Sequence, residues 1–258
     1  MKTAVVLTLI AGALSAPAPT LTSRQFGFGS WTSLLPKPGS SGSSSGGFDF
    51  PSLGSWGLGG SSSSEDSSSS SSSSGGFGGL GGSSTASDVT DNSGCKDLTF
   101  IFARGTTETG NMGTVIGPKV ASELNSLTNN NAAIQGVNYP ANAAGNAQLG
   151  AAGGPEMADL VNQALQQCPD TKVVLGGYSQ GAMVVHNAAG KLQAGQVVGA
   201  VTFGDPFKTQ HPDTIEHFKT WCATGDPVCR GGANFMAHLS YGSNAAEAAQ
   251  FLVSAAGL

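Results

Sequence analysis

The sequence contains little charge. Only 10% of its 258 residues are Asp, Glu, Lys or Arg, with Lys and Arg together numbering 11 and a formal net charge of −5. No basic stripe occurs anywhere in the chain. This pattern argues against nucleic acid and strongly anionic molecules as partners, because clustered Lys and Arg side chains bind both. It favours a neutral or apolar ligand.

The sequence also lacks a long apolar run. Residues 4–11 form a short one, which follows Met1-Lys2-Thr3 and is followed by small residues up to Ala16. A membrane-spanning helix needs about 20 apolar residues, whereas this pattern is typical of a secretory signal peptide. We therefore expect residues 1–16 to be a signal peptide, and the protein to be secreted and extracellular, with no stable membrane insertion.

Cysteine is scarce as well, and the chain has four: Cys95, Cys168, Cys222 and Cys229. They contain no C-x-x-C pair and have no nearby His cluster, so we expect no metal site. In an oxidising compartment an even number of cysteines indicates disulfides, and four can pair in three ways. Cys222 and Cys229 are close enough in sequence to close a short loop, which leaves Cys95 to pair with Cys168.

Glycine and serine divide the chain into two parts. They dominate residues 36–93, where residues 67–74 are an unbroken run of serines. Such a segment buries too little apolar surface to offset the entropy lost on ordering. We expect residues 17–93 to be a low-complexity, disordered arm and residues 94–258 to be one globular domain.

Within the second part, short apolar runs alternate with helical patterns. The expected strands are residues 98–102, 134–139, 172–178, 197–203 and 218–223, and the expected helices are residues 112–127, 155–167, 182–192 and 245–255. This alternation predicts an α/β fold, a three-layer sandwich in which helices flank both faces of a central, mainly parallel sheet.

One pentapeptide, Gly177-Tyr178-Ser179-Gln180-Gly181, carries a chemical signature. It is a G-x-S-x-G nucleophile elbow between an expected strand and an expected helix. The sharp turn projects the serine hydroxyl from the sheet, and the two glycines permit close backbone approach. The following helix directs amide donors and the positive end of its dipole at the site. Ser179 is therefore predicted to be the nucleophile of a serine esterase.

A serine nucleophile needs a base, and four histidines are candidates. His186 falls on the same expected helix as Ser179, so we expect it to pack structurally. His211 and His217 flank the start of an expected strand. His238 precedes the last expected helix, in a position from which a loop can return to the serine. His238 is the predicted base and His217 the second candidate.

The base in turn needs an orienting acid. Asp226 lies at the end of an expected strand, inside the loop between Cys222 and Cys229. A disulfide across this loop would fix the direction of its carboxylate. Asp226 is the predicted acid, and Asp205, which also follows a strand, is its rival.

Hydrolysis also needs donors for the oxyanion. The backbone N–H group of Gln180, immediately after the nucleophile, is one expected donor. The second should come from the loop after the first strand, where Thr106 can offer both an amide and a hydroxyl.

With these residues in place, the chain resembles the cutinase family. The resemblance spans about residues 94–258 and rests on four stretches: Phe102–Gly105 with Thr107–Asn111; Gly177–Gly181; Thr224–Asp226 with Val228-Cys229; and His238-Leu239 with Tyr241-Gly242. It implies a small α/β-hydrolase with Ser179, Asp226 and His238 as its triad. It also implies the two disulfides named above, an exposed active site and no cofactor. Family members commonly carry Ser where this chain has Thr106.

The resemblance implies hydrolysis of cutin or a similar aliphatic polyester. We expect the partner to be this ester substrate or a short-to-medium acyl ester, and the protein to be a monomer. Residues 233–236, an apolar stretch beside His238, would contact acyl chains. An acetylxylan esterase is the first alternative, because it shares the fold, the triad and the elbow. The second alternative is a non-catalytic secreted surface or adhesion protein.

Overall fold

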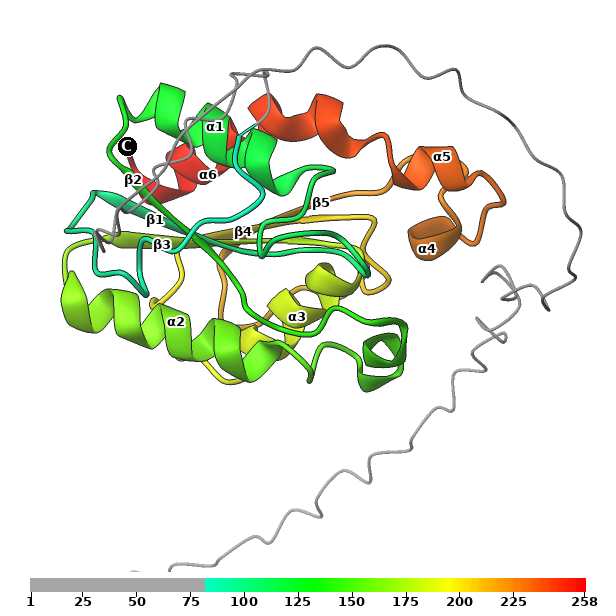
Figure 1. The fold of residues 1–258 in the computed structure, drawn as a ribbon, viewed down its shortest axis with the longest axis horizontal. Coiled ribbons are helices and arrows are strands. Elements are labelled where there is room, and N and C mark those ends of the chain that lie inside the picture. Colours follow the sequence, from blue (N-terminus) through cyan, green and yellow to red (C-terminus); the bar gives the residue numbers. More distant parts are fainter. Residues whose placement is uncertain (1–81) are drawn as a thin grey trace, which may run out of the picture. The chain divides into compact units, whose positions relative to one another are not determined.

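The computed structural model describes residues 82–258, in which a five-stranded parallel sheet lies between two layers of helices (Figure 1). The sheet order is β2-β1-β3-β4-β5. The strands are β1 (Leu98–Ala103), β2 (Ala132–Gly136), β3 (Lys172–Tyr178), β4 (Gly199–Phe203) and β5 (His217–Trp221). Each neighbouring pair is parallel. The predicted α/β fold is therefore confirmed.

The inner strands are buried along almost their whole length. Every residue of β1 and β4 is buried, and in β3 only Lys172 is exposed. Near-continuous apolar runs form such strands because helices cover both faces of a parallel sheet. By contrast, the edge strand β5 is only partly buried.

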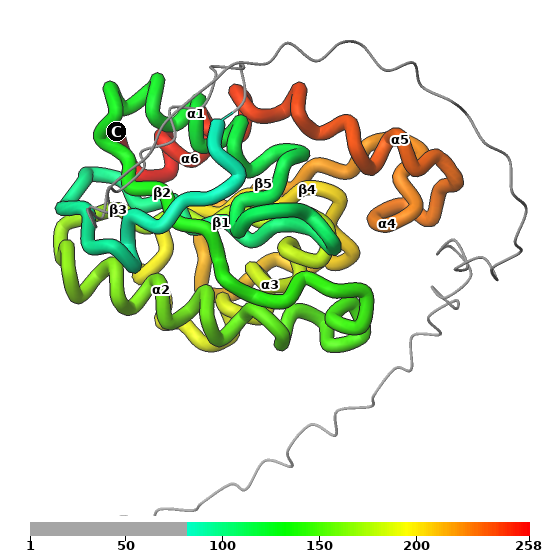
Figure 2. The backbone as a smooth tube through the Cα atoms, in the orientation of Figure 1, coloured from blue at the N-terminus to red at the C-terminus, as the bar shows by residue number. Residues whose placement is uncertain are grey.

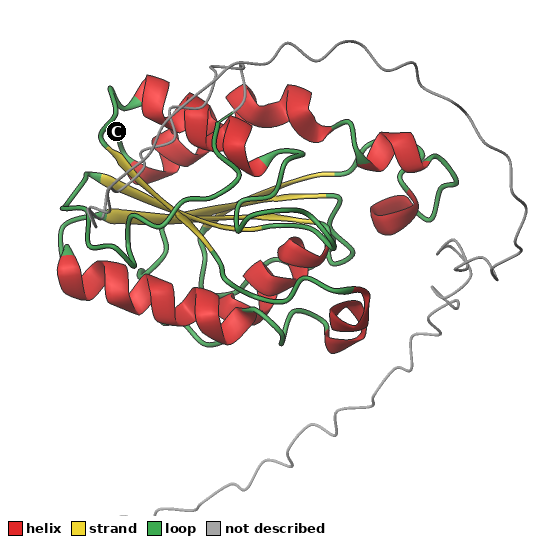
Figure 3. Ribbon diagram, in the orientation of Figure 1, coloured by secondary structure: helices red, strands yellow, loops and turns green. Residues whose placement is uncertain are grey.

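In the described part of the chain, the four longest helices make the outer layers, as Figure 3 shows. The helices α1 (Gly117–Leu127) and α6 (Ala245–Ala256) cover one face, and α2 (Gly154–Gln167) and α3 (Gln180–Ala189) cover the other. Proline in the first turn of α1 and of α2 favours helix initiation there, since its missing N–H group needs no partner at that position. Because α1 begins at Gly117, the expected helix start at Met112 was five residues early.

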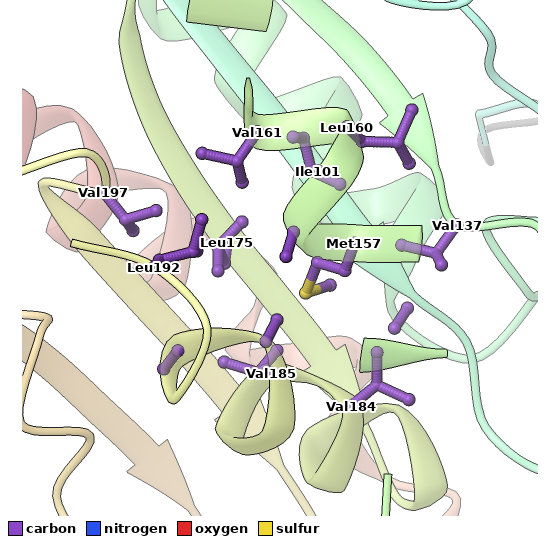
Figure 4. Close-up of a cluster of buried hydrophobic side chains, with 14 of the residues drawn as sticks. Ile101, Val137, Met157, Leu160, Val161, Leu175, Val184, Val185, Leu192 and Val197 are labelled. Atoms are coloured by element: carbon purple, nitrogen blue, oxygen red, sulfur yellow. The ribbon is translucent and has the colours of Figure 1, made fainter. Parts of the chain in front are cut away.

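Two hydrophobic cores lie on opposite faces of the sheet. Side chains alternate along a strand, so Ile101 packs toward α2 and α3, while its neighbours Phe100 and Phe102 pack toward α1 and α6. Figure 4 shows the first core, in which Ile101 and Leu175 meet residues of α2 and α3. Burial of each such side chain stabilises the fold by about 1.5–3 kcal/mol.

The ordered domain begins upstream of the expected boundary at Gly94. Val89 is buried in the first core, and its N–H group donates to Oε1 of Gln135 at 3.0 Å. The carboxylate of Asp88 accepts from the N–H group of Ile134 at 2.8 Å. Residues 82–93 thus cover the outer edge of β2, so the expectation of disorder was wrong for them. The predicted signal peptide and the serine run lie outside the described residues.

The carboxyl ends of the five parallel strands share one edge of the sheet, the usual place for a ligand site in such folds. The loops that follow them carry short helices: η2 (Ala143–Gln148), α4 (Pro227–Arg230), α5 (Phe235–His238) and η3 (Tyr241–Asn244). Figure 2 shows α4 and α5 together beyond one end of the sheet. These short helices were not predicted, since four to six residues are too few for a helical pattern.

Both predicted disulfides are present. Cys95–Cys168 joins the residues before β1 to the end of α2, across 73 residues of sequence. Cys222–Cys229 closes the loop after β5, across 7 residues.

We predict that the two disulfides differ in their effect on stability. A bridge restricts the unfolded chain more when it closes a longer loop. Loss of Cys95–Cys168 should therefore lower the free energy of unfolding by about 4 kcal/mol, and loss of Cys222–Cys229 by about 2 kcal/mol. Urea denaturation of the paired Cys→Ala variants measures both values. A larger loss for the short loop would contradict this prediction.

Candidate active site

Ser179 occupies a strained turn between β3 and α3. Its backbone has φ 55° and ψ −116°, outside the regions that residues with a side chain usually adopt. Such strain persists only where the surrounding structure enforces it, and it is concentrated at functional sites. The turn projects Ser179 at the carboxyl edge of the sheet, as the elbow motif predicted.

Two glycines enforce this turn through close backbone contacts. A Cβ atom on Gly177 would overlap the carbonyl oxygen of Gly181, and one on Gly181 would overlap the carbonyl oxygen of Ala103. Neither position has room for any side chain. Helix α3 therefore approaches β1 and β3 closely enough to hold Ser179 at their ends.

Ser179, His238 and Asp226 form one hydrogen-bonded chain. Nε2 of His238 lies 2.9 Å from Oγ of Ser179, and Nδ1 lies 2.8 Å from Oδ2 of Asp226. The Asp226 and His238 side chains are buried, whereas Ser179 is partly exposed. The structure thus brings together the three residues that the sequence predicted for the triad, which lie on three separate loops.

The ring of His238 is held from several sides. The ring of Tyr178 stacks on it with centroids 4.9 Å apart, and the Tyr178 hydroxyl donates to the His238 carbonyl oxygen at 2.8 Å. Gly204, with φ +57°, also lies against the ring, where a Cβ atom would come within 2.6 Å of Cε1. The elbow and the end of β4 together determine the orientation of the imidazole.

The carboxylate of Asp226 accepts from three donors. Oδ1 accepts from the N–H group of Val228 at 2.7 Å, while Oδ2 lies within hydrogen-bonding distance of both His238 and the Tyr241 hydroxyl. Burial acts to raise the pKa of Asp226, but the bonds from Tyr241, His238 and Val228 outweigh it, so the pKa lies below its usual value. Tyr241 was not among the predicted site residues, although it lies in one of the stretches that carried the family resemblance.

A second His–Asp pair lies apart from Ser179. Nε2 of His186 is 2.9 Å from Oδ2 of Asp205, which also accepts from the Thr202 hydroxyl at 2.8 Å. The other oxygen of Asp205 accepts from the N–H group of Phe207 at 2.7 Å. Both oxygens of the Asp205 carboxylate thus have partners, which come from α3, from β4 and from the loop after β4. Neither the rival acid Asp205 nor the second base candidate, His217 on the exposed edge strand, belongs to the hydrogen-bonded chain.

The two residues expected to bind the oxyanion lie beside each other. Gln180 is the first residue of α3, where backbone N–H groups have no partner within the helix. Its side-chain Nε2 lies 3.2 Å from Oγ1 of Thr106, and 2.8 Å from both Oδ1 of Asn146 and the carbonyl oxygen of Asn142. The Gln180 side chain therefore ties the loop after β1 to η2. The sequence did not predict Asn142 and Asn146 as site residues, because no motif near them points to a role in the site.

Glu108 holds the loop that carries Thr106. Its carboxylate accepts from the N–H groups of Gly105 at 2.7 Å, Thr114 at 2.8 Å and Val115 at 2.9 Å. Hydrogen bonds from backbone amides to a carboxylate are strong. They stabilise the turn in which Thr106 faces Gln180.

Exposed apolar side chains lie on two of the segments that form this site. Phe235 is 61% exposed, Met236 69% and Leu239 41%, and all three flank His238 in or next to α5. Leu149, 41% exposed, directly follows η2. Large apolar side chains grouped on a surface indicate a binding site.

An elbow serine joined to an imidazole and a carboxylate, at the edge of a parallel sheet between helices, defines a serine esterase of the α/β-hydrolase class. The family model described as Cutinase matches residues 94–256. The chain belongs to the cutinase family.

Individual relatives agree with this assignment. Cutinase 4 of Emericella nidulans is 78% identical over 174 residues, which cover 67% of this chain and 78% of that protein. Among solved structures, a Trichoderma reesei cutinase bound to a phosphonate inhibitor is 37% identical, with a TM-score of 0.60, over 67% of this chain and 80% of that one. An acetylxylan esterase is 26% identical, with a TM-score of 0.53, over 64% of this chain and 100% of that one.

The lowered pKa of Asp226 predicts a stability that depends on pH. A carboxyl group whose pKa is lower in the folded protein stabilises it fully above the unfolded pKa of about 3.9, and this contribution is lost as the pH falls through the folded pKa. The stability difference between the wild type and Asp226→Asn should therefore shrink below about pH 4. Urea denaturation between about pH 7 and pH 3 measures it. Asp170→Asn, which changes an exposed carboxylate, is the control, and a constant difference for Asp226→Asn would contradict the prediction.

Proposed function

We propose that this protein hydrolyses carboxylic esters, with cutin or a similar aliphatic polyester as its substrate, through an acyl-enzyme on Ser179. The observation that carries this proposal is the hydrogen-bonded chain of Ser179, His238 and Asp226 beside an exposed apolar surface. The family assignment supports it.

In the proposed mechanism, His238, oriented by Asp226, accepts the proton of Ser179 as the serine oxygen attacks the ester carbonyl. The protonated His238 then gives that proton to the departing alcohol. Water repeats the sequence on the acyl-enzyme and releases the acid. Because the three groups already lie within 2.9 Å of their neighbours, proton transfer needs no large rearrangement.

The negative oxygen of the intermediate is assigned to the N–H groups of Gln180 and Thr106 and to the Thr106 hydroxyl. The Thr106 hydroxyl oxygen accepts from Nε2 of Gln180, so its own proton can be given to another acceptor. In this structure that acceptor is Oδ1 of Asn146, at 3.2 Å. Rotation toward the substrate would complete the oxyanion hole that the family's usual serine would supply.

The apolar surface favours an aliphatic ester over an acetyl group. Phe235, Met236 and Leu239 offer large apolar contacts next to His238, which an acetyl group is too small to use. Several relatives are named cutinases. The similarity to an acetylxylan esterase keeps polysaccharide deacetylation as the alternative.

We also propose that the protein acts outside the cell, as a monomer. Two disulfides support this location, because they persist in oxidising compartments. Within residues 82–258, no helix has the length and apolar character needed to cross a membrane.

Replacement of the nucleophile tests the mechanism. Ser179→Ala should lower kcat on p-nitrophenyl butyrate by about a million-fold, since no other group can form the acyl-enzyme. An alkyl phosphonate should add to a peptide containing Ser179 in the wild type and fail to react with the variant, as mass spectrometry would report. Loss of less than about tenfold in kcat would mean that another residue is the nucleophile.

Replacement of the exposed apolar residues tests the substrate class. Phe235→Ser with Met236→Ser should lower kcat/KM for p-nitrophenyl palmitate and insoluble polyester at least about tenfold, because each lost apolar contact is worth about 1–3 kcal/mol. Activity on p-nitrophenyl acetate should change little. Leu127→Ser, which removes a 43% exposed side chain at the end of α1, is the matched control. Wild-type activity confined to acetate and acetylated xylan would favour the deacetylase.

A further inference from the structure

Tyr241 lies directly behind the triad. It is the first residue of η3 and only 1% exposed. Its hydroxyl donates to Oδ2 of Asp226 at 2.5 Å and accepts from the N–H group of Ala223 at 3.0 Å. Because the Ala223 amide occupies a lone pair of the phenol oxygen, the phenol proton is directed at Asp226.

Tyr241 and His238 share one oxygen atom of Asp226. Oδ2 is 2.5 Å from the phenol oxygen and 2.8 Å from Nδ1 of His238. The other oxygen, Oδ1, accepts from the N–H group of Val228. Any charge on Oδ2 that the phenol stabilises is less available to the imidazole. A short O–H···O⁻ bond is among the stronger hydrogen bonds in proteins.

We propose that Tyr241 is a positioning residue for the esterase reaction: it fixes the direction of the Asp226 carboxylate and divides its negative charge between the phenol and the imidazole of His238. This inference rests on the proposed function. It adds a fourth hydrogen-bonded residue to the chain that begins at Ser179, and it accounts for a buried tyrosine hydroxyl that the mechanism above does not use.

The phenol is suited to act as a constant donor. Burial, together with its bond to the Asp226 carboxylate, raises the pKa of Tyr241. A raised pKa keeps the hydroxyl protonated at any pH at which a serine esterase works. The Tyr241 hydroxyl therefore stays protonated throughout, and its bond to Asp226 sets the strength of the hydrogen bond between Asp226 and His238.

Few other titratable groups face this pair. Tyr178 of β3 stacks on His238 and donates to its backbone oxygen rather than to the carboxylate. The Tyr241 hydroxyl also lies 3.5 Å from Sγ of Cys229, which is held in a disulfide with Cys222. Nζ of Lys208 lies 3.6 Å from Sγ of Cys222, and Glu108 interacts with Tyr178 over a longer distance.

The first test is Tyr241→Phe, with kcat/KM for p-nitrophenyl butyrate measured against pH. Without the phenol proton, more charge remains on Oδ2 for the imidazolium form of His238. The acid limb of the profile should therefore move to higher pH, by roughly half a unit to one unit. Because the reacting groups also lose their alignment, kcat should fall about tenfold with little change in KM.

Tyr178→Phe is the matched control. It also removes a buried tyrosine hydroxyl beside His238, but one that does not bind the carboxylate. Its acid limb should stay at the wild-type pH, whatever its effect on kcat. An equal shift in both variants would mean that loss of packing, and not the bond to Asp226, causes the change, and would overturn the inference.

A second variant tests the same bond in the opposite direction. Incorporation of 3-fluorotyrosine at position 241 keeps the ring and makes its hydroxyl a stronger donor. The acid limb should then move to lower pH, and this measurement remains decisive if Tyr241→Phe fails to fold. The pH at which the proton NMR signal of the His238 Nδ1–H group titrates, measured in the absence of substrate, should rise in Tyr241→Phe and fall in the 3-fluorotyrosine protein.

These outcomes separate the inference from the proposed function. If the wild type hydrolyses no ester, the proposed function fails, while the NMR titration still reports on Tyr241. If the wild type is active and both Tyr241 variants keep the wild-type acid limb and the wild-type NMR titration, the proposed function stands and the role of Tyr241 is refuted.

Discussion

The close approach of α3 to the ends of β1 and β3 is the constraint on which the rest of the site depends. Gly177 and Gly181 allow backbone atoms to meet where any side chain would overlap them. This contact forces Ser179 into a strained conformation, which the buried strands on either side stabilise. It also places the first backbone amides of α3 beside the serine hydroxyl. The buried strands of the core thus stabilise the strained backbone that positions Ser179.

Around this turn, hydrogen bonds connect loops that are far apart in sequence. The Gln180 side chain joins the loop after β1 to η2, and Tyr178 holds the backbone of His238. Asp226 and Tyr241 connect the disulfide-closed loop after β5 to the segment before α6. Loops at the edge of a parallel sheet have few buried apolar contacts of their own, so polar contacts and a covalent bridge determine their positions. The apolar side chains beside His238 stay exposed and available for an ester.

Within residues 82–258, two His–Asp pairs have different environments. His186 and Asp205 form a pair whose carboxylate also accepts from Thr202 of β4 and from Phe207 in the loop that follows β4. The pair of His238 and Asp226 has nearly the same separation but reaches Ser179. The first pair lies in contact with the loop that carries Gly204, and Gly204 lies against the ring of His238. Distance to the Ser179 hydroxyl, and not the pairing itself, distinguishes the two pairs.

The sequence alone determined the fold class, the bounds of β3 and the position of the Ser179 elbow, because the apolar pattern and the elbow motif reflect local chemistry. The sequence also predicted His238 as the base and Asp226 as the acid, but it could only rank them above His217 and Asp205. Only tertiary structure showed which of these candidates lie within hydrogen-bonding distance of Ser179 and of each other, because three loops have to fold together to bring their side chains close. It alone revealed Tyr241, Asn146 and the order of residues 82–93. Their partners lie on other elements of the fold, so no local pattern in the sequence encodes their contacts.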